Sequence, residues 1–217
     1  MIARILRARF DPPDPVVLDA AVRILNRQGI VAFPTETFYG LAVDPSRAGA
    51  LRELFLLKGR SAGHPVPVLL SGRKELSGLV REPLPDSLSP LVESFWPGPL
   101  TLVLTHAGGP AARAAVSDRG TIAVRVTSHP LARALIERFG GPLTGTSANR
   151  TGQPPMRNPE EVREVFGDGL DLVLDGGPSP GNVPSTLLDL TGDRPVILRE
   201  GAISRAEIGR VLGETPG

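Results

Sequence analysis

Apolar runs of strand length alternate with amphipathic stretches along most of the chain. Asp14 followed by Pro15 predicts the start of a helix, because a capping carboxylate and a proline suit the first helical positions. Apolar residues then recur at helical spacing as far as Gly29. The continuous apolar run at residues 30–33 ends at Pro34, and it predicts a buried strand that leads into a loop.

The same pattern continues to the C-terminus. Ser46 is expected to cap a second helix that ends at Gly59. Ser204 and Glu207 have the spacing of a capping box, and further helices are predicted at residues 130–139, 159–166 and 205–212. Gly or Pro bounds several predicted strands, which lie at residues 66–70, 100–105, 121–126, 143–146, 172–174, 185–190 and 196–198.

This interleaving of strands and helices favours α/β layers. Neighbouring strands near the C-terminus indicate a mixed rather than a purely parallel sheet. With 217 residues and no internal repeat or long linker, residues 1–217 are expected to form one domain. The Pro-rich stretch 82–90 is the one candidate boundary, and it is interpreted as a surface connection.

Composition narrows the class further. The chain is 41% hydrophobic and 22% charged, as globular proteins are, and its net charge of +1 gives no reason to expect non-specific nucleic-acid binding. It has no cysteine, and its histidines (64, 106 and 129) lack metal-ligand spacing. We therefore expect neither disulfides nor a metal site built by the protein alone. Neither a signal peptide nor a membrane-spanning stretch is recognisable, so a cytoplasmic protein is expected.

Lys58-Gly59-Arg60 follows the second predicted helix and suits a polyphosphate. The ammonium supplies a point charge, and the guanidinium can bind two oxygens at once. The alternative is a helix end whose cations offset the helix dipole.

Residues 144–149 carry hydroxyl and amide side chains at the end of a predicted strand, where open α/β sheets bind ligands. Ser147 and Asn149 are two residues apart, so in an extended segment both side chains point the same way. The alternative is a turn that Asn149 stabilises.

Two further segments suit a small polar ligand. Residues 34–41 place Thr35 and other polar groups between apolar flanks, although a tight surface loop is equally compatible. Thr121 and Arg125 share one face of a predicted strand. An inward-facing Arg125 needs an anionic partner, either a structural carboxylate or a substrate. Residues 96–99 are interpreted as a rigid turn.

Together these segments resemble the YrdC/TsaC family of threonylcarbamoyl-AMP synthases from about Gly29 to the last predicted helix. The motifs that carry the resemblance occur in the family's order: residues 34–41, 58–60, 96–101, 124–126, 147–149, 184–186 and 198–201. The resemblance implies a twisted mixed β-sheet flanked by helices around a large, concave, basic cavity. It also places the chain with the short, single-domain form of the family.

The resemblance further implies the synthesis of threonylcarbamoyl-AMP and pyrophosphate from L-threonine, bicarbonate and ATP, for the tRNA modification threonylcarbamoyladenosine. Mg²⁺ would arrive with the ATP, and other proteins would transfer the product to tRNA. Threonine would be held by Thr35, Arg125 and Ser185. ATP would be bound by Lys58, Arg60, Thr121, Ser147, Asn149 and Arg199, and four of these, Lys58, Arg60, Ser147 and Asn149, would also form the catalytic set.

Some positions depart from the family pattern. Leu69 and Pro155 stand where longer relatives place a histidine and a serine that contact substrates, so those contacts are not expected here. Ser61 replaces a common proline, and His64 replaces other polar residues. Two alternative functions remain open: a nucleotide-binding relative of the YciO type with another specificity, and an RNA-binding module without catalysis, whose binding would weaken steeply with salt.

Overall fold

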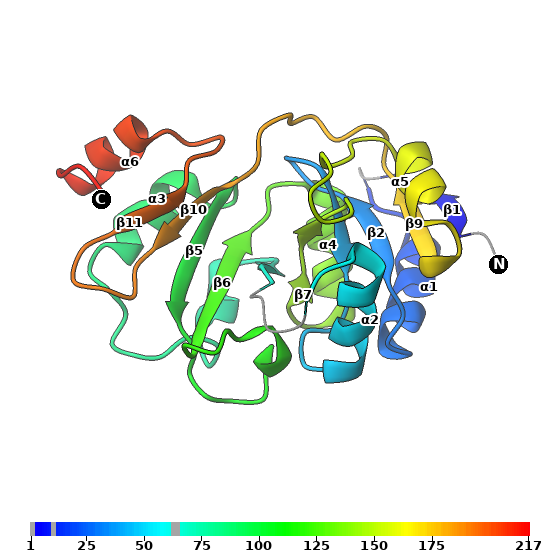
Figure 1. The fold of residues 1–217 in the computed structure, drawn as a ribbon, viewed down its shortest axis with the longest axis horizontal. Helices are drawn as coiled ribbons and strands as arrows, with labels where there is room; N and C mark the ends of the chain where they lie inside the picture. The colour runs from blue at the N-terminus through cyan, green and yellow to red at the C-terminus, as the bar shows by residue number, and fades with distance from the viewer. Residues whose placement is uncertain (1–2, 10–11, 62–65) are drawn as a thin grey trace.

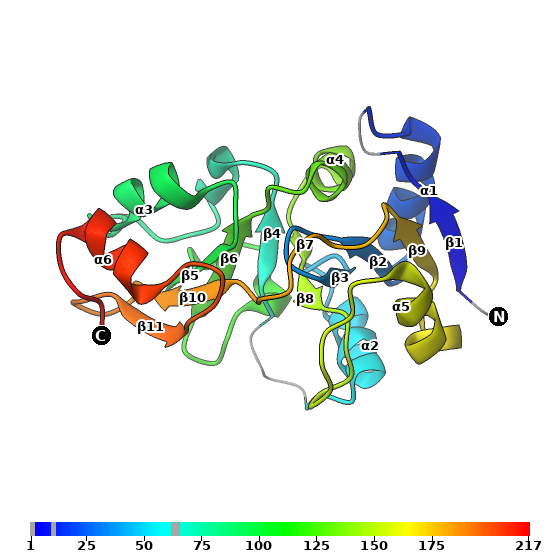
Figure 2. The same cartoon turned by 90° about the horizontal axis from the view of Figure 1, so that it is seen from above.

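The computed structural model describes residues 3–9, 12–61 and 66–217. Its strands form a five-stranded sheet with the order β1-β9-β2-β3-β8 and a six-stranded sheet with the order β11-β10-β5-β6-β4-β7. Both sheets are mixed, as predicted, but the single sheet that the resemblance implied is divided in two. Figures 1 and 2 show the sheets side by side, with the two chain ends at opposite extremes of the molecule.

The strands of the first sheet are β1 (Arg4–Arg7), β2 (Val31–Pro34), β3 (Tyr39–Ala42), β8 (Thr146–Ser147) and β9 (Leu172–Asp175). Those of the second are β4 (Val68–Leu70), β5 (Leu100–Thr105), β6 (Thr121–Val126), β7 (Leu143–Thr144), β10 (Thr186–Asp189) and β11 (Val196–Arg199). The α-helices are α1 (Pro15–Asn26), α2 (Ala48–Lys58), α3 (Leu88–Phe95), α4 (Pro130–Phe139), α5 (Pro159–Phe166) and α6 (Arg205–Leu212). Short 3₁₀ helices span Arg73–Leu76, Arg113–Ala115 and Gly167–Gly169.

Helices cover both faces of the first sheet. In Figure 2, α1 and α4 lie on one side of β2 and β9, and α2 and α5 lie on the other. The side chains of β2 alternate accordingly: Val31 and Phe33 pack with α1 and α4, whereas Ala32 belongs to the core that includes α2 and α5. A strand buried on both faces shows a continuous apolar run, which is why β2 was predictable.

Gly145 lets the chain pass from one sheet to the other. β7 pairs with β4 in the second sheet, and β8, one residue further on, pairs with β3 in the first. A Cβ atom at Gly145 would lie 2.3 Å from the Leu69 side chain, and the Gly145 amide donates to the Pro67 carbonyl at 2.8 Å. Only glycine fits this close approach, so the single strand predicted at residues 143–146 is divided here.

Two helix caps are confirmed and one is wrong. The Asp14 carboxylate accepts from the Val16 amide at 2.9 Å, and Ser204 and Glu207 form the predicted capping box. Ser46 does not cap α2, because its hydroxyl donates to the Asp44 carboxylate at 2.6 Å. Arg47 stands at the N-cap and makes no side-chain cap bond.

Two strands and one α-helix among the described residues were not predicted from the sequence. These are β1, which pairs in parallel with β9, β3, which returns antiparallel to β2, and α3. α3 begins inside the Pro-rich stretch that was interpreted as a surface connection. Pro90 is tolerated there because it occupies the first turn of the helix.

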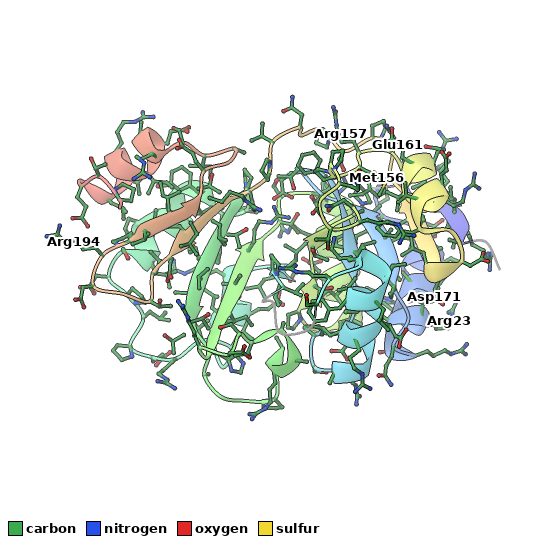
Figure 3. All side chains as sticks on the ribbon, in the orientation of Figure 1. Arg23, Met156, Arg157, Glu161, Asp171 and Arg194 are labelled. Carbon is green, nitrogen blue, oxygen red and sulfur yellow. The ribbon has the colours of Figure 1, made fainter. Side chains whose placement is uncertain are left out.

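The segment 176–185 joins β9 of the first sheet to β10 of the second, and we call it the strap. Figure 1 shows it crossing from one sheet to the other. Arg157 anchors it: the guanidinium donates from Nε and one terminal nitrogen to the Ser179 carbonyl at 3.1 and 3.0 Å, and the Ser179 amide donates back at 2.9 Å. Figure 3 labels Arg157 beside this connection.

Candidate active site

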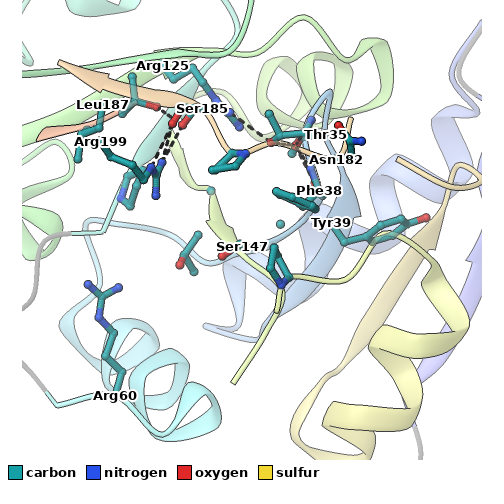
Figure 4. A pocket seen from close by; sticks show the side chains of 18 residues that line it. Thr35, Phe38, Tyr39, Arg60, Arg125, Ser147, Asn182, Ser185, Leu187 and Arg199 are labelled. Carbon is teal, nitrogen blue, oxygen red and sulfur yellow. Dashed lines mark hydrogen bonds between the residues drawn. The ribbon is translucent and has the colours of Figure 1, made fainter. Parts of the chain in front are cut away.

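A cavity of about 610 Å³ lies where the two sheets and the strap meet. Segments far apart in the sequence contribute to its wall, as Figure 4 shows. Its volume is typical of a small-molecule site. It is lined by Thr35, Thr37, Phe38, Tyr39, Gly40, Arg60, Pro67, Thr101, Arg125, Gly145, Thr146, Ser147, Pro155, Asn182, Pro184, Ser185, Leu187 and Arg199.

Arg125 reaches this cavity from β6 and is buried. One terminal nitrogen lies 3.6 Å from a Glu36 carboxylate oxygen and 3.5 Å from the Thr37 hydroxyl, and its Nε has no hydrogen-bond partner among the described residues. Burial lowers the pKa of Arg125, and Glu36 opposes this shift. The structural carboxylate considered from the sequence therefore exists, but it leaves most of the five guanidinium donors available for a further anion.

Ser185 and Arg199 form a second polar group in the wall. Arg199 donates from Nε and one terminal nitrogen to the Ser185 carbonyl at 3.2 and 2.8 Å, and also to the Ser185 hydroxyl at 3.2 Å. Thr101 lies 2.9 Å from the same hydroxyl. The Ser185 hydroxyl is thus fixed from two sides at the cavity wall.

Thr35 organises the loop between β2 and β3. Its hydroxyl donates to the Phe38 carbonyl at 2.7 Å and accepts from the Thr37 amide at 3.2 Å. These bonds add to the backbone bond from the Thr35 amide to the Phe38 carbonyl at 3.2 Å. Thr35 therefore shapes the cavity wall as well as lining it.

Lys58 and the loop at residues 147–149 form one unit beside the main cavity. The Lys58 ammonium donates to the Ser147 carbonyl, to the Asn149 carbonyl at 2.9 Å and to the Asn149 side-chain oxygen at 3.4 Å. Since an ammonium has three donors, this loop can occupy all of them. Arg60, at the exit of α2, points toward the main cavity (Figure 4).

Asn149 is held by its own loop. Its side-chain oxygen accepts from the Ser147 hydroxyl at 2.6 Å, and its amide nitrogen donates to the carbonyls of Arg150 and Gln153 at 3.0 and 2.8 Å. The two side chains lie on one side of the segment, as predicted. The turn considered as the alternative role of Asn149 is also present.

Lys58, Arg60, Ser147 and Asn149 line a smaller cavity of about 420 Å³. Arg60, Thr146 and Ser147 belong to both walls, so the two cavities adjoin. ATP, the ligand that the resemblance implies for these residues, would span the two cavities. This arrangement joins segments about 90 positions apart, as the sequence predicted for residues 58–60 and 147–149.

If Lys58 binds the ATP that the family resemblance implies, that binding should depend on pH. Burial, and then the neighbouring Arg60, lower the pKa of Lys58 to about 8. A bound triphosphate favours the charged ammonium, so ATP affinity should fall as the pH rises above 8, by up to about tenfold per pH unit. Calorimetry at pH 7 and pH 9 measures this change. Lys58→Met should abolish the dependence, and equal wild-type affinities at both values would contradict it.

The lining of the two cavities differs in two ways from the set of site residues predicted from the sequence. Thr121 lines neither cavity; its hydroxyl lies 2.7 Å from that of Ser117. Thr101 and Asn182 were not singled out and do line the main cavity. Thr101 could have been recognised from its place in the motif at 96–101, whereas Asn182 depends on the path of the strap. His64 lies outside the described residues.

The described residues contain neither a metal-binding cluster nor a membrane-spanning helix. Within residues 3–9, 12–61 and 66–217, no three side chains of His, Asp or Glu gather as a metal site would require. No helix in those same ranges is long and apolar enough to cross a membrane.

The fold and the cavity define an α/β protein with an arginine-lined cavity at the junction of two mixed sheets. Residues 23–201 match the family of Sua5, YciO and YrdC proteins, described as "Telomere recombination". The chain belongs to this family.

Relatives of two lengths are similar to the chain. The threonylcarbamoyl-AMP synthase of Bacillus subtilis is 36% identical, with 92% of this chain aligned to 57% of that protein. The threonylcarbamoyl-AMP synthase of Coxiella burnetii is 37% identical, with 81% of this chain aligned to 94% of that protein. The chain thus spans little more than half of the longer relative and nearly all of the shorter one.

Solved structures show the same division. The crystal structure of P. abyssi Sua5 complexed with L-threonine superposes on this chain with a TM-score of 0.91 at 34% identity. The superposition covers 100% of this chain and 62% of the Sua5 chain. The crystal structure of Escherichia coli YciO gives a TM-score of 0.84 at 28% identity, covering 93% of this chain and 97% of that one.

Proposed function

We propose that the protein is an L-threonylcarbamoyladenylate synthase, which forms threonylcarbamoyl-AMP and pyrophosphate from L-threonine, bicarbonate and ATP. The observation that carries the proposal is the adjoining of two cavities through Arg60, Thr146 and Ser147. The main cavity contains Arg125, whose guanidinium has donors left for a carboxylate. The smaller cavity contains the cations Lys58 and Arg60, which suit phosphates. The relatives named as synthases, and the threonine complex of P. abyssi Sua5, support the same assignment.

The amino acid would occupy the main cavity. Arg125 would bind its carboxylate through the donors that Glu36 and Thr37 leave available. Ser185, whose hydroxyl Thr101 and Arg199 fix, would meet the polar atoms of the substrate. Thr35 would complete this end of the site through the loop that it shapes.

The nucleotide would lie across both cavities. Arg60 and Arg199 would bind phosphate oxygens, and Lys58 would place a positive charge beside them while it holds Ser147 and Asn149 in position. Thr121 stays a prediction that no contact with the cavities supports. Because no carboxylate among the described residues lines either cavity, Mg²⁺ would be held by the phosphates and water.

The reaction needs no protein nucleophile. The amine nitrogen of threonine bonds to the carbon of bicarbonate, water leaves, and an oxygen of the resulting carbamate attacks the α-phosphorus as pyrophosphate departs. The chain's residues would align the reactants and neutralise phosphate charge, which are both large contributions to catalysis.

The proposed activity has consequences for the domain organisation of the chain and for the fate of its product. We propose that the chain works as one cytoplasmic domain whose product other proteins transfer to tRNA. One apolar core includes residues of both sheets, such as Ala32 of β2 and Leu102 of β5, which supports a single folding unit.

Pyrophosphate release tests the function. Purified protein with ATP and Mg²⁺ should release pyrophosphate only when both bicarbonate and an amino acid are present, and threonine should give the highest rate among threonine, serine and valine. Release without an amino acid would favour a YciO-like protein of other specificity. Salt-sensitive RNA binding without any release would favour the RNA-binding module.

A further inference from the structure

The charge on the wall of the main cavity is of one sign. Among the described residues that line it, Arg60, Arg125 and Arg199 are charged at neutral pH, and none is Asp, Glu, His or Lys. They come from the segment just after α2, from β6 and from β11, three separate parts of the fold. The cavity therefore attracts anions and offers no carboxylate to a cation.

Arg125 and Arg199 are close enough for one guanidinium to affect the other. Burial lowers the pKa of Arg199, and Arg125 lowers it further. Glu36 is a counter-charge to Arg125, 3.6 Å from its guanidinium, and it accepts a hydrogen bond from the Thr127 hydroxyl at 2.5 Å. Lys58 adds another positive charge beside the cavity. Positive charge thus exceeds negative charge around the site.

The remaining titratable groups of the surrounding elements do not alter this balance. The Tyr39 hydroxyl donates to the Gly177 carbonyl at 2.8 Å, and burial raises its pKa. Burial lowers the pKa of His129 despite nearby Glu36, so that imidazole is neutral at pH 7. Glu200 faces α6, where it accepts from the Arg205 amide at 2.9 Å. No carboxylate among these groups faces the cavity.

We infer that the nucleotide-free cavity binds its amino acid with the α-amine already neutral, and releases the amine's proton to solvent on binding. The inference rests on the proposed function. A free amino acid is a zwitterion at neutral pH, so its carboxylate would suit Arg125, while its ammonium would enter a cavity whose described charged lining groups are all guanidinium groups. Like charge and loss of water both disfavour the charged amine.

This selection would prepare the nucleophile. The ammonium loses one proton to solvent, and the freed lone pair forms the bond to the carbon of bicarbonate, while the C–OH bond of bicarbonate breaks and its hydroxide leaves with a second amine proton as water. The wall then needs no residue that acts as a base, which agrees with the absence of one among its described residues. The arginines would position the carboxylate, and their positive charge would favour the neutral amine over the ammonium.

Calorimetry of threonine binding, without nucleotide and in two buffers of different ionisation enthalpy, measures the released protons directly. At pH 7 we expect about one proton per threonine bound, and affinity should rise about tenfold between pH 6.5 and 7.5. Lys58, whose pKa is about 8, stays largely protonated in this interval.

A matched ligand separates the amine from the protein's own groups. 2,3-Dihydroxybutanoic acid keeps the carboxylate and the side chain of threonine but replaces the amine with a hydroxyl. It should bind with no proton release and with an affinity that does not change between pH 6.5 and 7.5.

The results of these measurements distinguish failure of the neutral-amine inference from failure of the proposed function. Threonine binding without proton release, or the same release with the dihydroxy acid, would overturn this inference while leaving the proposed function intact. If threonine neither binds nor supports pyrophosphate release, the proposed function fails and the inference fails with it.

Discussion

Arg125→Gln is expected to raise the threonine KM by at least about thirtyfold while changing the ATP KM by less than about threefold. Arg125 is buried, and its only described partners are Glu36 at 3.6 Å and Thr37 at 3.5 Å. Its remaining donors can therefore pair with the substrate carboxylate. Removing one side of a buried charged pair typically costs about 2–5 kcal/mol. Initial rates of pyrophosphate release, with each substrate varied in turn, measure both constants.

The controls separate recognition from stability. Because Arg125→Gln leaves the partly buried Glu36 without its counter-charge, the double variant Glu36→Gln/Arg125→Gln should recover thermal stability yet keep the high threonine KM. Arg138→Gln, which removes an exposed guanidinium paired with Asp19, should leave both constants unchanged. Equal increases in the KM of threonine and ATP would show that Arg125 does not recognise the amino acid selectively.

The strands and helices with strong local signals were predictable from the sequence. β5 and β6 match the predicted ranges residue for residue, because both are long apolar runs at the centre of the second sheet. α4, α5 and α6 match as well, since proline or a capping box marks their starts. Local chemistry fixes these elements.

The unpredicted elements depend on distant partners. β1 is an edge strand with two exposed arginines, and its strand conformation comes from pairing with β9, about 170 positions away. The division of the 143–146 strand depends on the Leu69 side chain beside Gly145. Neither partner is visible from the local pattern.

The candidate site was predictable as a set of residues but not as a set of contacts. The position of Arg125 on a predicted strand indicated an inward-facing charge, and the structure gives it both an incomplete shell of partners and a place in the cavity. The spacing of Ser147 and Asn149 indicated a shared direction, yet only the fold shows that Lys58 holds their loop. Asn182 enters the wall because Arg157 anchors the strap that carries it.

Gly201→Ala should lower both stability and threonine binding, because the site depends on a close backbone contact. A Cβ atom at Gly201 would lie 2.2 Å from the Pro184 carbonyl oxygen and 2.6 Å from the Ser185 carbonyl carbon. Both are backbone atoms, so no side-chain rotation can relieve the clash. The segment at 184–185 must shift, and with it the Ser185 carbonyl and hydroxyl that Arg199 contacts.

Overpacking of this kind costs about 1–3 kcal/mol, which corresponds to a loss of several degrees in Tm for a chain of this size. Threonine KM should rise by about tenfold, because the displaced Ser185 hydroxyl no longer meets the substrate. Gly141→Ala is the matched control, since a Cβ atom there meets nothing within 4 Å, and it should change Tm and both KM values little. If Gly201→Ala lowered Tm but left the threonine KM unchanged, Ser185 would have no part in binding the amino acid, and its role would be confined to the packing of β10 and β11.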